Sequence, residues 1–227
     1  MKLKKNRKRN LRVAFDGFSA SGKSLGAKLI SKKYNLRFLS SGLLYRYASF
    51  LLLKHKPKNK ISFLKKKFKS LNYKKISDKN LHTQKNSSYV SIIAKEKKVR
   101  TILKKFQLIF ARKYKNVCIE GRDISYAILP RADIKFFFVC NLDTASKRRW
   151  KELKKRNKKI KLKEVKKTLK IRDFNDKNRK HNPLIKSSDS IVIRSDILNK
   201  RDMVKKMSEI VNKKLKQKYG FGNKRRK

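Results

Sequence analysis

The sequence predicts an α/β fold in which a five-stranded parallel sheet is flanked by helices. Five short apolar segments alternate along the chain with segments of helical periodicity. This alternation is typical of βαβ units, whose strands are buried on both faces of a parallel sheet. The chain has 227 residues, 38% of them hydrophobic, which is enough for the core of one domain.

The predicted elements begin after a basic tail at residues 1–10. We expect strands at 11–16, 36–39, 116–120, 134–140 and 190–193. Helical patterns cover 24–34, 43–53, 61–71, 83–113, 143–156, 161–180 and 200–216. Residues 11–216 therefore form a single predicted domain, and a second basic tail follows at 217–227.

The chain is strongly basic, with 69 Lys and Arg residues against 15 Asp and Glu and a formal net charge of +54. Such a surplus suggests a nucleic-acid partner, but these proteins usually gather their charge on one face with aromatic residues beside it. Here the Lys residues are spread from end to end, as a compositional bias would place them. We therefore expect only weak, non-specific binding to polyanions, which falls steeply as salt rises.

Two cysteines exclude a disulfide scaffold and a zinc site with four Cys ligands. Cys118 and Cys140 each close a predicted strand, so we expect unreactive core thiols. No apolar segment is long enough to span a membrane, and none follows the basic start as in a secretory signal. We expect a cytoplasmic protein that is a monomer, because no apolar stripe is left over.

The strongest motif is a phosphate-binding loop, G-x-x-x-x-G-K-[ST], between the first predicted strand and the first helix. It consists of Gly17, Phe18, Ser19, Ala20, Ser21, Gly22, Lys23 and Ser24. In such a loop, backbone N–H groups and the helix N-terminus surround the phosphates of a nucleoside triphosphate. We expect Lys23 to reach the β- and γ-phosphates and the Ser24 hydroxyl to bind Mg²⁺.

A GTPase is excluded because the chain has no D-x-x-G motif. Residues 199–202 read N-K-x-D, the pattern of a guanine-binding loop, but they lie at the start of a predicted helix. We interpret them as the N-terminus of that helix.

Acidic residues are scarce, so those beside arginines are candidates for a ligand site. Arg122 and Asp123 follow directly on the third predicted strand, and ligands of open parallel sheets bind at the carboxyl ends of strands. Arg172, Asp176 and Arg179 have the spacing i, i+4, i+7, which favours one face of a helix. One arginine guanidinium can bind two phosphate oxygens at once, and a carboxylate accepts hydrogen bonds from sugar hydroxyls. A surface salt-bridge ladder would use the same spacing.

The order and spacing of several blocks resemble those of the bacterial cytidylate kinases, a family of nucleoside monophosphate kinases. The similarity covers residues from about 13 to 216 and includes the phosphate loop and the arginine-rich segments. The other blocks are Ser41 to Arg46, Thr83-Gln84, Ser91, Val99-Arg100, Arg148 to Leu153, Pro183-Leu184 and Ser188-Asp189. The resemblance implies a P-loop kinase fold with an acceptor-binding region at about 46–113 and a lid at about 143–182.

The resemblance also implies ATP as phosphate donor, Mg²⁺ as metal, and CMP or dCMP as acceptor. The residues that would face the cytosine base are Ser41, Ser91, Arg100 and Asp123. Those that would bind the acceptor phosphate or ribose are Arg46, Arg122, Arg172, Asp176 and Arg179. Those that would close over the triphosphate from the lid are Arg148 and Arg149. Lys23, Arg122 and Arg172 would stabilise the charge that develops during transfer.

Two departures from the family pattern lie near the acceptor site. The family has Asp-Ser-Gly where this chain has Ser40-Ser41-Gly42, so one carboxylate is missing. The segment between Arg46 and Thr83 is shorter than the inserted subdomain of the family's longer form.

Two other functions are compatible with the residues alone. One is a kinase of the same architecture that acts on a different small monophosphate. The other is a basic RNA-binding protein whose phosphate loop is a relic; it would bind RNA tightly at physiological salt and transfer no phosphate.

Overall fold

A parallel five-stranded sheet with the strand order β2-β3-β1-β4-β5 forms the centre of the protein. The computed structural model describes residues 10–220 except 74–75, 77–80 and 156–157, so residues 1–9 and 221–227 of the two basic tails lie outside the described residues, whereas residues 217–219 belong to the last helix. The strands are β1 (Arg12–Gly17), β2 (Arg37–Ser40), β3 (Val117–Glu120), β4 (Ile134–Val139) and β5 (Ile191–Arg194). The predicted five-stranded parallel sheet is confirmed.

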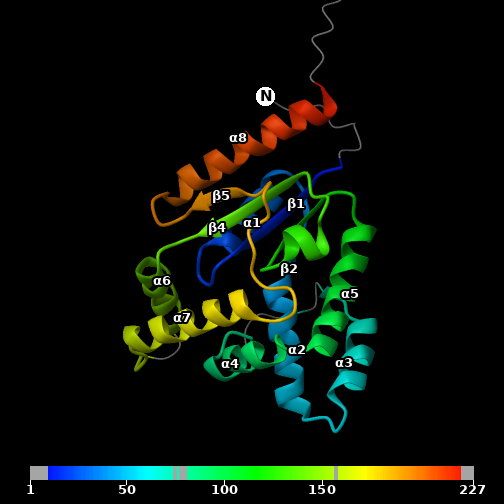
Figure 1. Cartoon of the computed structure of the whole chain (residues 1–227), viewed down its shortest axis with the longest axis vertical. Coiled ribbons are helices and arrows are strands. Elements are labelled where there is room, and N and C mark those ends of the chain that lie inside the picture. Colours follow the sequence, from blue (N-terminus) through cyan, green and yellow to red (C-terminus); the bar gives the residue numbers. More distant parts are fainter. Residues whose placement is uncertain (1–9, 74–75, 77–80, 156–157, 221–227) are drawn as a thin grey trace, which may run out of the picture.

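Helices flank this sheet and extend beyond its carboxyl edge (Figure 1). Two of them, α1 (Lys23–Lys33) and α8 (Lys200–Tyr219), pack on one face. The elements packed on the other face are α2 (Ser41–His55), α3 (Lys60–Lys69), α4 (Gln84–Ile93), α5 (Lys97–Lys113) and the short π-helix η2 (Ile124–Ile128). The helices α6 (Leu142–Lys154) and α7 (Leu162–Asn178) pack against each other and lie to the left in Figure 1. No helix in the described ranges is long and apolar enough to cross a lipid bilayer.

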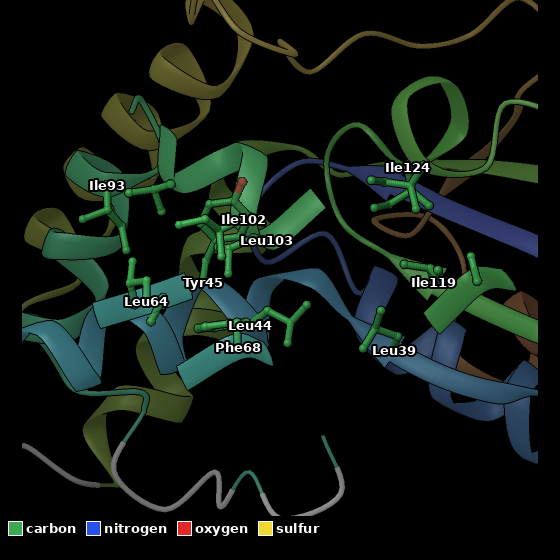
Figure 2. Packing of buried hydrophobic residues seen from close by; sticks show 14 of the residues in the cluster. Leu39, Leu44, Tyr45, Leu64, Phe68, Ile93, Ile102, Leu103, Ile119 and Ile124 are labelled. Carbon is green, nitrogen blue, oxygen red and sulfur yellow. The ribbon is translucent and has the colours of Figure 1, made fainter. Parts of the chain in front are cut away.

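Alternation along the strands builds two hydrophobic cores. Val13 and Phe15 of β1 pack toward α1 and α8, whereas Ala14 points to the other face. Figure 2 shows that second core, where Leu39 and Ile119 from the sheet belong to the same cluster as the buried helix side chains. The two cores hold the sheet rigidly from both faces, so its carboxyl edge is a fixed platform for a site.

Three local predictions need correction. The single predicted helix 83–113 is two helices, because the chain turns at residues 94–96, where the backbone of Glu96 is extended. The π-helix η2 was not predicted, since its N-terminal N–H groups are satisfied by a residue from β1 rather than by a local cap. Helix α7 ends at Asn178, so Arg179 follows the helix in an extended conformation.

Two smaller predictions are confirmed and one is wrong. Cys118 is a fully buried core thiol, and burial raises its pKa to about 12. Cys140 lies just after β4 and is only half-buried, so it is not a core residue, although burial raises the pKa of its thiol too. Asn199 begins α8 as predicted, because its side-chain oxygen accepts a hydrogen bond from the backbone N–H of Asp202. The N-K-x-D spelling is therefore a helix cap.

Gly17 ends β1 where the chain enters the phosphate loop, and its backbone φ of +146° is rarely adopted by residues that have a side chain. A Cβ at this position would lie 2.3 Å from the carbonyl oxygen of Phe138 in β4. We expect Gly17→Ala to lower the free energy of unfolding, measured in urea, by about 3 kcal/mol or more.

Gly220→Ala is the matched control for this substitution. Its backbone also has positive φ, +49°, but a Cβ there would meet no atom within 4 Å. We expect a cost of about 1 kcal/mol from the backbone alone. Equal losses for both variants would show that the close contact with Phe138 is unimportant.

Candidate active site

The phosphate loop leads from the end of β1 to the first turn of α1. Its backbone reverses direction through positive φ values at Ala20 (54°) and Gly22 (80°). In the described part of the chain no side chain caps the N-terminus of α1, and the same is true of α5 and α7, whereas side chains cap α2, α3, α4, α6 and α8. The N–H groups in the first turn of a helix need acceptors, and a phosphate supplies them. The loop therefore fits the triphosphate that its sequence predicts.

Lys23 folds back over this loop. Its Nζ donates a hydrogen bond to the carbonyl oxygen of Phe18 at 3.0 Å, and the residue is only 6% exposed. Burial, assisted by the positive charge of Arg122, lowers the pKa of Lys23 to about 7. The ammonium group is thus held in a place where an anion would strongly favour its charged form.

The predicted metal ligand, Ser24, is the second residue of α1, and its side chain is exposed. Across the described ranges, no group of three or more His, Cys, Asp and Glu residues could hold a metal ion. Mg²⁺ commonly binds through one or two protein oxygens together with water and substrate phosphates. The accessible hydroxyl of Ser24 fits that kind of site.

A second pocket, the acceptor cleft, opens to solvent beside the loop. It lies between α2, α4, the β3–η2 turn and α7. Its lining residues are Ser41, Gly42, Tyr45, Val90, Ser91, Ala94, Arg100, Gly121, Arg122, Asp123, Arg172, Asp176 and Arg179. The structure therefore brings together all of the predicted acceptor-binding residues except Arg46.

Arginines and carboxylates alternate along the wall of the acceptor cleft. Arg100 Nη2 lies 2.5 Å from Asp123 Oδ2, and Arg122 Nε lies 2.9 Å from Asp176 Oδ2. Arg179 joins the two pairs, with Nη1 3.0 Å from Asp176 Oδ1 and Nη2 3.8 Å from Asp123 Oδ1. Asp176 and Arg179 are thus linked to the β3–η2 turn in a buried network rather than forming a surface ladder.

This network leaves positive charge and hydrogen-bond donors unmatched. No carboxylate within the described residues lies within ion-pair distance of Arg172, and its burial together with the charge of Arg122 lowers its pKa. Arg100 Nε and Arg179 Nη2 are buried without a hydrogen-bond acceptor in the part of the chain that the structure describes. Buried donors without acceptors are costly, so the cleft is suited to a ligand rich in anionic and acceptor oxygens.

Arg46 lies outside the lining of the acceptor cleft. Its Nη1 donates to the carbonyl oxygen of Leu81 at 3.2 Å and to Ser87 Oγ at 2.7 Å, which ties α2 to the start of α4. In this arrangement its guanidinium supports the helices around the cleft.

The two arginines that the family resemblance places in a lid, Arg148 and Arg149, have different partners. Arg148 donates from Nη2 to the carbonyl oxygen of Ser195 at 2.6 Å and from Nη1 to its hydroxyl at 3.1 Å. A Cβ on Gly22 would lie 3.9 Å from the same Nη1, so Arg148 stands beside the phosphate loop. Arg149 instead pairs with Glu152 on α6 at 2.9 Å.

Two buried carboxylates lie at the strand ends: the sequence places Asp16 at the edge where ligands of parallel sheets bind, whereas the role of Glu120 was not predicted. Asp16 accepts hydrogen bonds from the N–H groups of Ile124 (2.8 Å) and Ser125 (2.7 Å), and so fixes the turn that carries Arg122. Burial raises the pKa of Asp16 to about 6 although these bonds act to lower it. The available signal was its position at the end of the first strand, directly before the loop.

Glu120 is the second of these carboxylates, and Ser40 donates a hydrogen bond to it. The same Ser40 hydroxyl accepts from the N–H of Leu43 and caps α2. A carboxylate at position 40, which the family pattern has, would face Glu120 with like charge. Serine can donate to Glu120, so the departure from the family pattern is structurally consistent here.

A phosphate loop that faces a second, arginine-lined cleft across the carboxyl edge of a parallel sheet is the arrangement of a P-loop kinase. The comparisons with known proteins specify the family. The family model described as cytidylate kinase matches residues 13–213. The chain belongs to the cytidylate kinase family.

Curated relatives cover nearly the whole chain. It is 34% identical to the cytidylate kinase of Clostridium tetani, over 88% of this chain and 92% of that protein. It is 33% identical to that of Clostridium botulinum, over 90% and 99%, and 31% identical to that of Mesomycoplasma hyopneumoniae, over 92% and 96%. Solved structures are less similar: a shikimate kinase from Bacteroides thetaiotaomicron has a TM-score of 0.48 and 10% identity, over 89% of this chain and 98% of that one.

The lowered pKa of Lys23 predicts proton uptake when ATP binds. At pH 8 a lysine with a pKa of about 7 is mostly neutral, and the phosphates of ATP, already ionised at that pH, would raise its pKa. Affinity should therefore be insensitive to this group below pH 7 and fall as pH rises above 7. Calorimetry at pH 8 in buffers of different ionisation heat should show about 0.9 proton taken up per ATP.

Two variants test the assignment of that proton. Lys23→Met should remove the uptake, whereas Lys28→Met, which changes an exposed lysine on the same helix, should preserve it. Undiminished uptake in Lys23→Met would assign the proton to another group.

Proposed function

We propose that this chain transfers the γ-phosphate of ATP to CMP or dCMP, which yields ADP and CDP or dCDP. The observation that carries the proposal is the direct contact between the two halves of the site. Arg122 donates to Ser19 Oγ of the phosphate loop at 3.0 Å and pairs with Asp176 of the acceptor cleft. The membership in the cytidylate kinase family supports cytosine as the base.

The donor half would bind the triphosphate of ATP on the N–H groups between Gly17 and Ser24. Lys23 would contact the β- and γ-phosphates, and Arg148 stands beside Gly22 where it can reach them. Mg²⁺, held by the Ser24 hydroxyl and by phosphate oxygens, would neutralise charge on the triphosphate.

The acceptor half would place the phosphate of CMP between Arg122 and Arg172. Cytosine presents an exocyclic amine that donates and ring atoms that accept. Asp123 and Arg100 offer the matching acceptor and donor at the far end of the cleft, beside Ser91 and Ser41. Asp176 lines the same cleft and pairs with Arg122, and there it would accept a hydrogen bond from the ribose.

In the reaction, an ionised oxygen of the CMP phosphate forms a bond to the γ-phosphorus of ATP. The bond from that phosphorus to the β,γ-bridging oxygen breaks, and ADP leaves with the electron pair. The second pKa of a phosphate is about 6, so the attacking oxygen needs no general base at pH 7. The protein's task is to bring two polyanions together, and Arg122, Arg172 and Lys23 offset their repulsion.

A transfer assay tests the proposal. The protein is mixed with ATP and Mg²⁺ and, separately, with CMP, dCMP, UMP, AMP or GMP, and the diphosphates are resolved by chromatography. We expect CMP and dCMP to be converted well above the others. Conversion of a different monophosphate would assign the chain another acceptor, and no conversion, with ATP and RNA both bound, would favour a nucleic-acid function.

Removing a cation from between the substrates should slow transfer. We expect Lys23→Ala or Arg122→Ala to lower kcat about 10²–10³-fold, the scale of one lost transition-state donor. Arg201→Ala, which changes an exposed arginine on α8, should leave kcat unchanged. A loss of less than about threefold in Arg122→Ala would contradict its placement at the acceptor phosphate.

Base selectivity should depend on Asp123. Asp123→Asn keeps the shape of the side chain but replaces an acceptor-only group with an amide. We expect the ratio of kcat/KM for CMP to that for UMP to fall about tenfold or more, while the Kd for ATP changes little. An unchanged ratio would mean that the base is read elsewhere.

A further inference from the structure

Helix α7 contacts the phosphate loop through a residue that the proposed reaction does not use. Asp173 Oδ1 accepts a hydrogen bond from the backbone N–H of Ser19 at 2.9 Å. Ser19, which is 3% exposed, also accepts from Arg122 Nη2 through its hydroxyl at 3.0 Å. The ammonium group of Lys177, one turn further along α7, lies 5.0 Å from the ring centre of Phe18. The start of the loop is thus held by side chains from outside it.

The same turn of α7 lines the acceptor cleft. Arg172 directly precedes Asp173, and Asp176 follows one turn later, bound to Arg122. One turn of helix therefore touches the donor loop through Asp173 and the acceptor cleft through its neighbours. Ser19 is the point where both connections meet, since Arg122 and Asp173 bind its two polar groups.

The charge of Asp173 acts on the donor side as well. Burial lowers the pKa of Lys23, and the negative charge of Asp173 is among those that oppose this shift. Asp173 is half-buried, and its negative charge acts on Arg122 and Arg172 as well as on Lys23. It is therefore placed to respond to ligands on either side.

We propose that Asp173 is a positioning residue that couples the binding of the two substrates. The proposal rests on the proposed function. A phosphate bound to Arg122 and Arg172 would fix both the β3–η2 turn and this turn of α7, and through them Ser19. A loop that is already held costs the incoming triphosphate less ordering, so the acceptor raises the affinity for the donor. By linkage, the donor raises the affinity for the acceptor by the same factor.

Calorimetry on the full chain measures this coupling. The Kd for CMP is determined without and with a saturating non-hydrolysable ATP analogue and Mg²⁺. In the unaltered protein we expect the analogue to tighten CMP binding about tenfold. In Asp173→Ala the factor should fall to within about twofold, because the link to Ser19 is lost.

Two further variants separate positioning from a general structural effect. Asp173→Asn keeps an oxygen that can accept from the Ser19 N–H, so most of the coupling should return. Asp143→Ala removes an exposed carboxylate on α6 that pairs only with Lys166 in the described structure, and the coupling should be intact. If Asp173→Ala does not unfold cooperatively on heating, Asp173→Leu, which keeps a similar volume but has no acceptor for the Ser19 N–H, takes its place and should also lose coupling.

The outcomes for the two proposals are distinguishable. CMP that binds with no change in Kd on adding the analogue, or coupling that is undiminished in Asp173→Ala, would overturn the role of Asp173 alone. A failure of CMP to bind at any concentration, with the analogue still bound, would overturn the proposed acceptor and, with it, this inference.

Discussion

The constraint on which the structure depends is the gathering of positive charge in a partly buried cleft. Lys23, Arg122 and Arg172 lie close enough that Arg122 lowers the pKa of both of the others, in addition to their burial. Charges of one sign are costly to bury together: the neighbouring carboxylates raise the pKa of Arg122, but the pKa values of Lys23 and Arg172 stay lowered. The free protein bears this cost because the fold is rigid, and polyphosphate ligands would relieve it. The unrelieved repulsion among these cations therefore favours the binding of anionic ligands.

The parallel sheet makes this arrangement possible. The strands β2, β3 and β1 are neighbours and end at the same edge, where each is followed by part of the site. Asp16, at the end of β1, binds the N–H groups of η2 and so fixes the turn after β3. Ser40 and Glu120 connect β2 to β3 in the same way. The site is thus built on strand ends that are bonded to one another, and α7 closes it from the side.

Much of this could be predicted from the sequence, because its signals are local. The strands are short apolar runs, the loop is a contiguous motif, and the arginines of the acceptor cleft stand beside the few acids of the chain. What could not be predicted depends on contacts between distant segments. Asp173 meets Ser19 only because α7 folds over the loop, and Arg46 is drawn to Leu81 and Ser87 by the packing of α4 on α2. The helix η2 likewise depends on the contact with Asp16, and at the break between α4 and α5 Glu96 pairs with Lys60 of α3.

The decisive measurement is a crystal structure of the protein with CMP and a non-hydrolysable ATP analogue. We expect the triphosphate to lie on the N–H groups of the loop between Gly17 and Ser24. We also expect the phosphate of CMP to contact Arg122 and Arg172, with cytosine toward Asp123. A complex in which the CMP phosphate lies away from these arginines, or in which the triphosphate binds elsewhere, would show that the cations of the cleft do not bring the two substrates together.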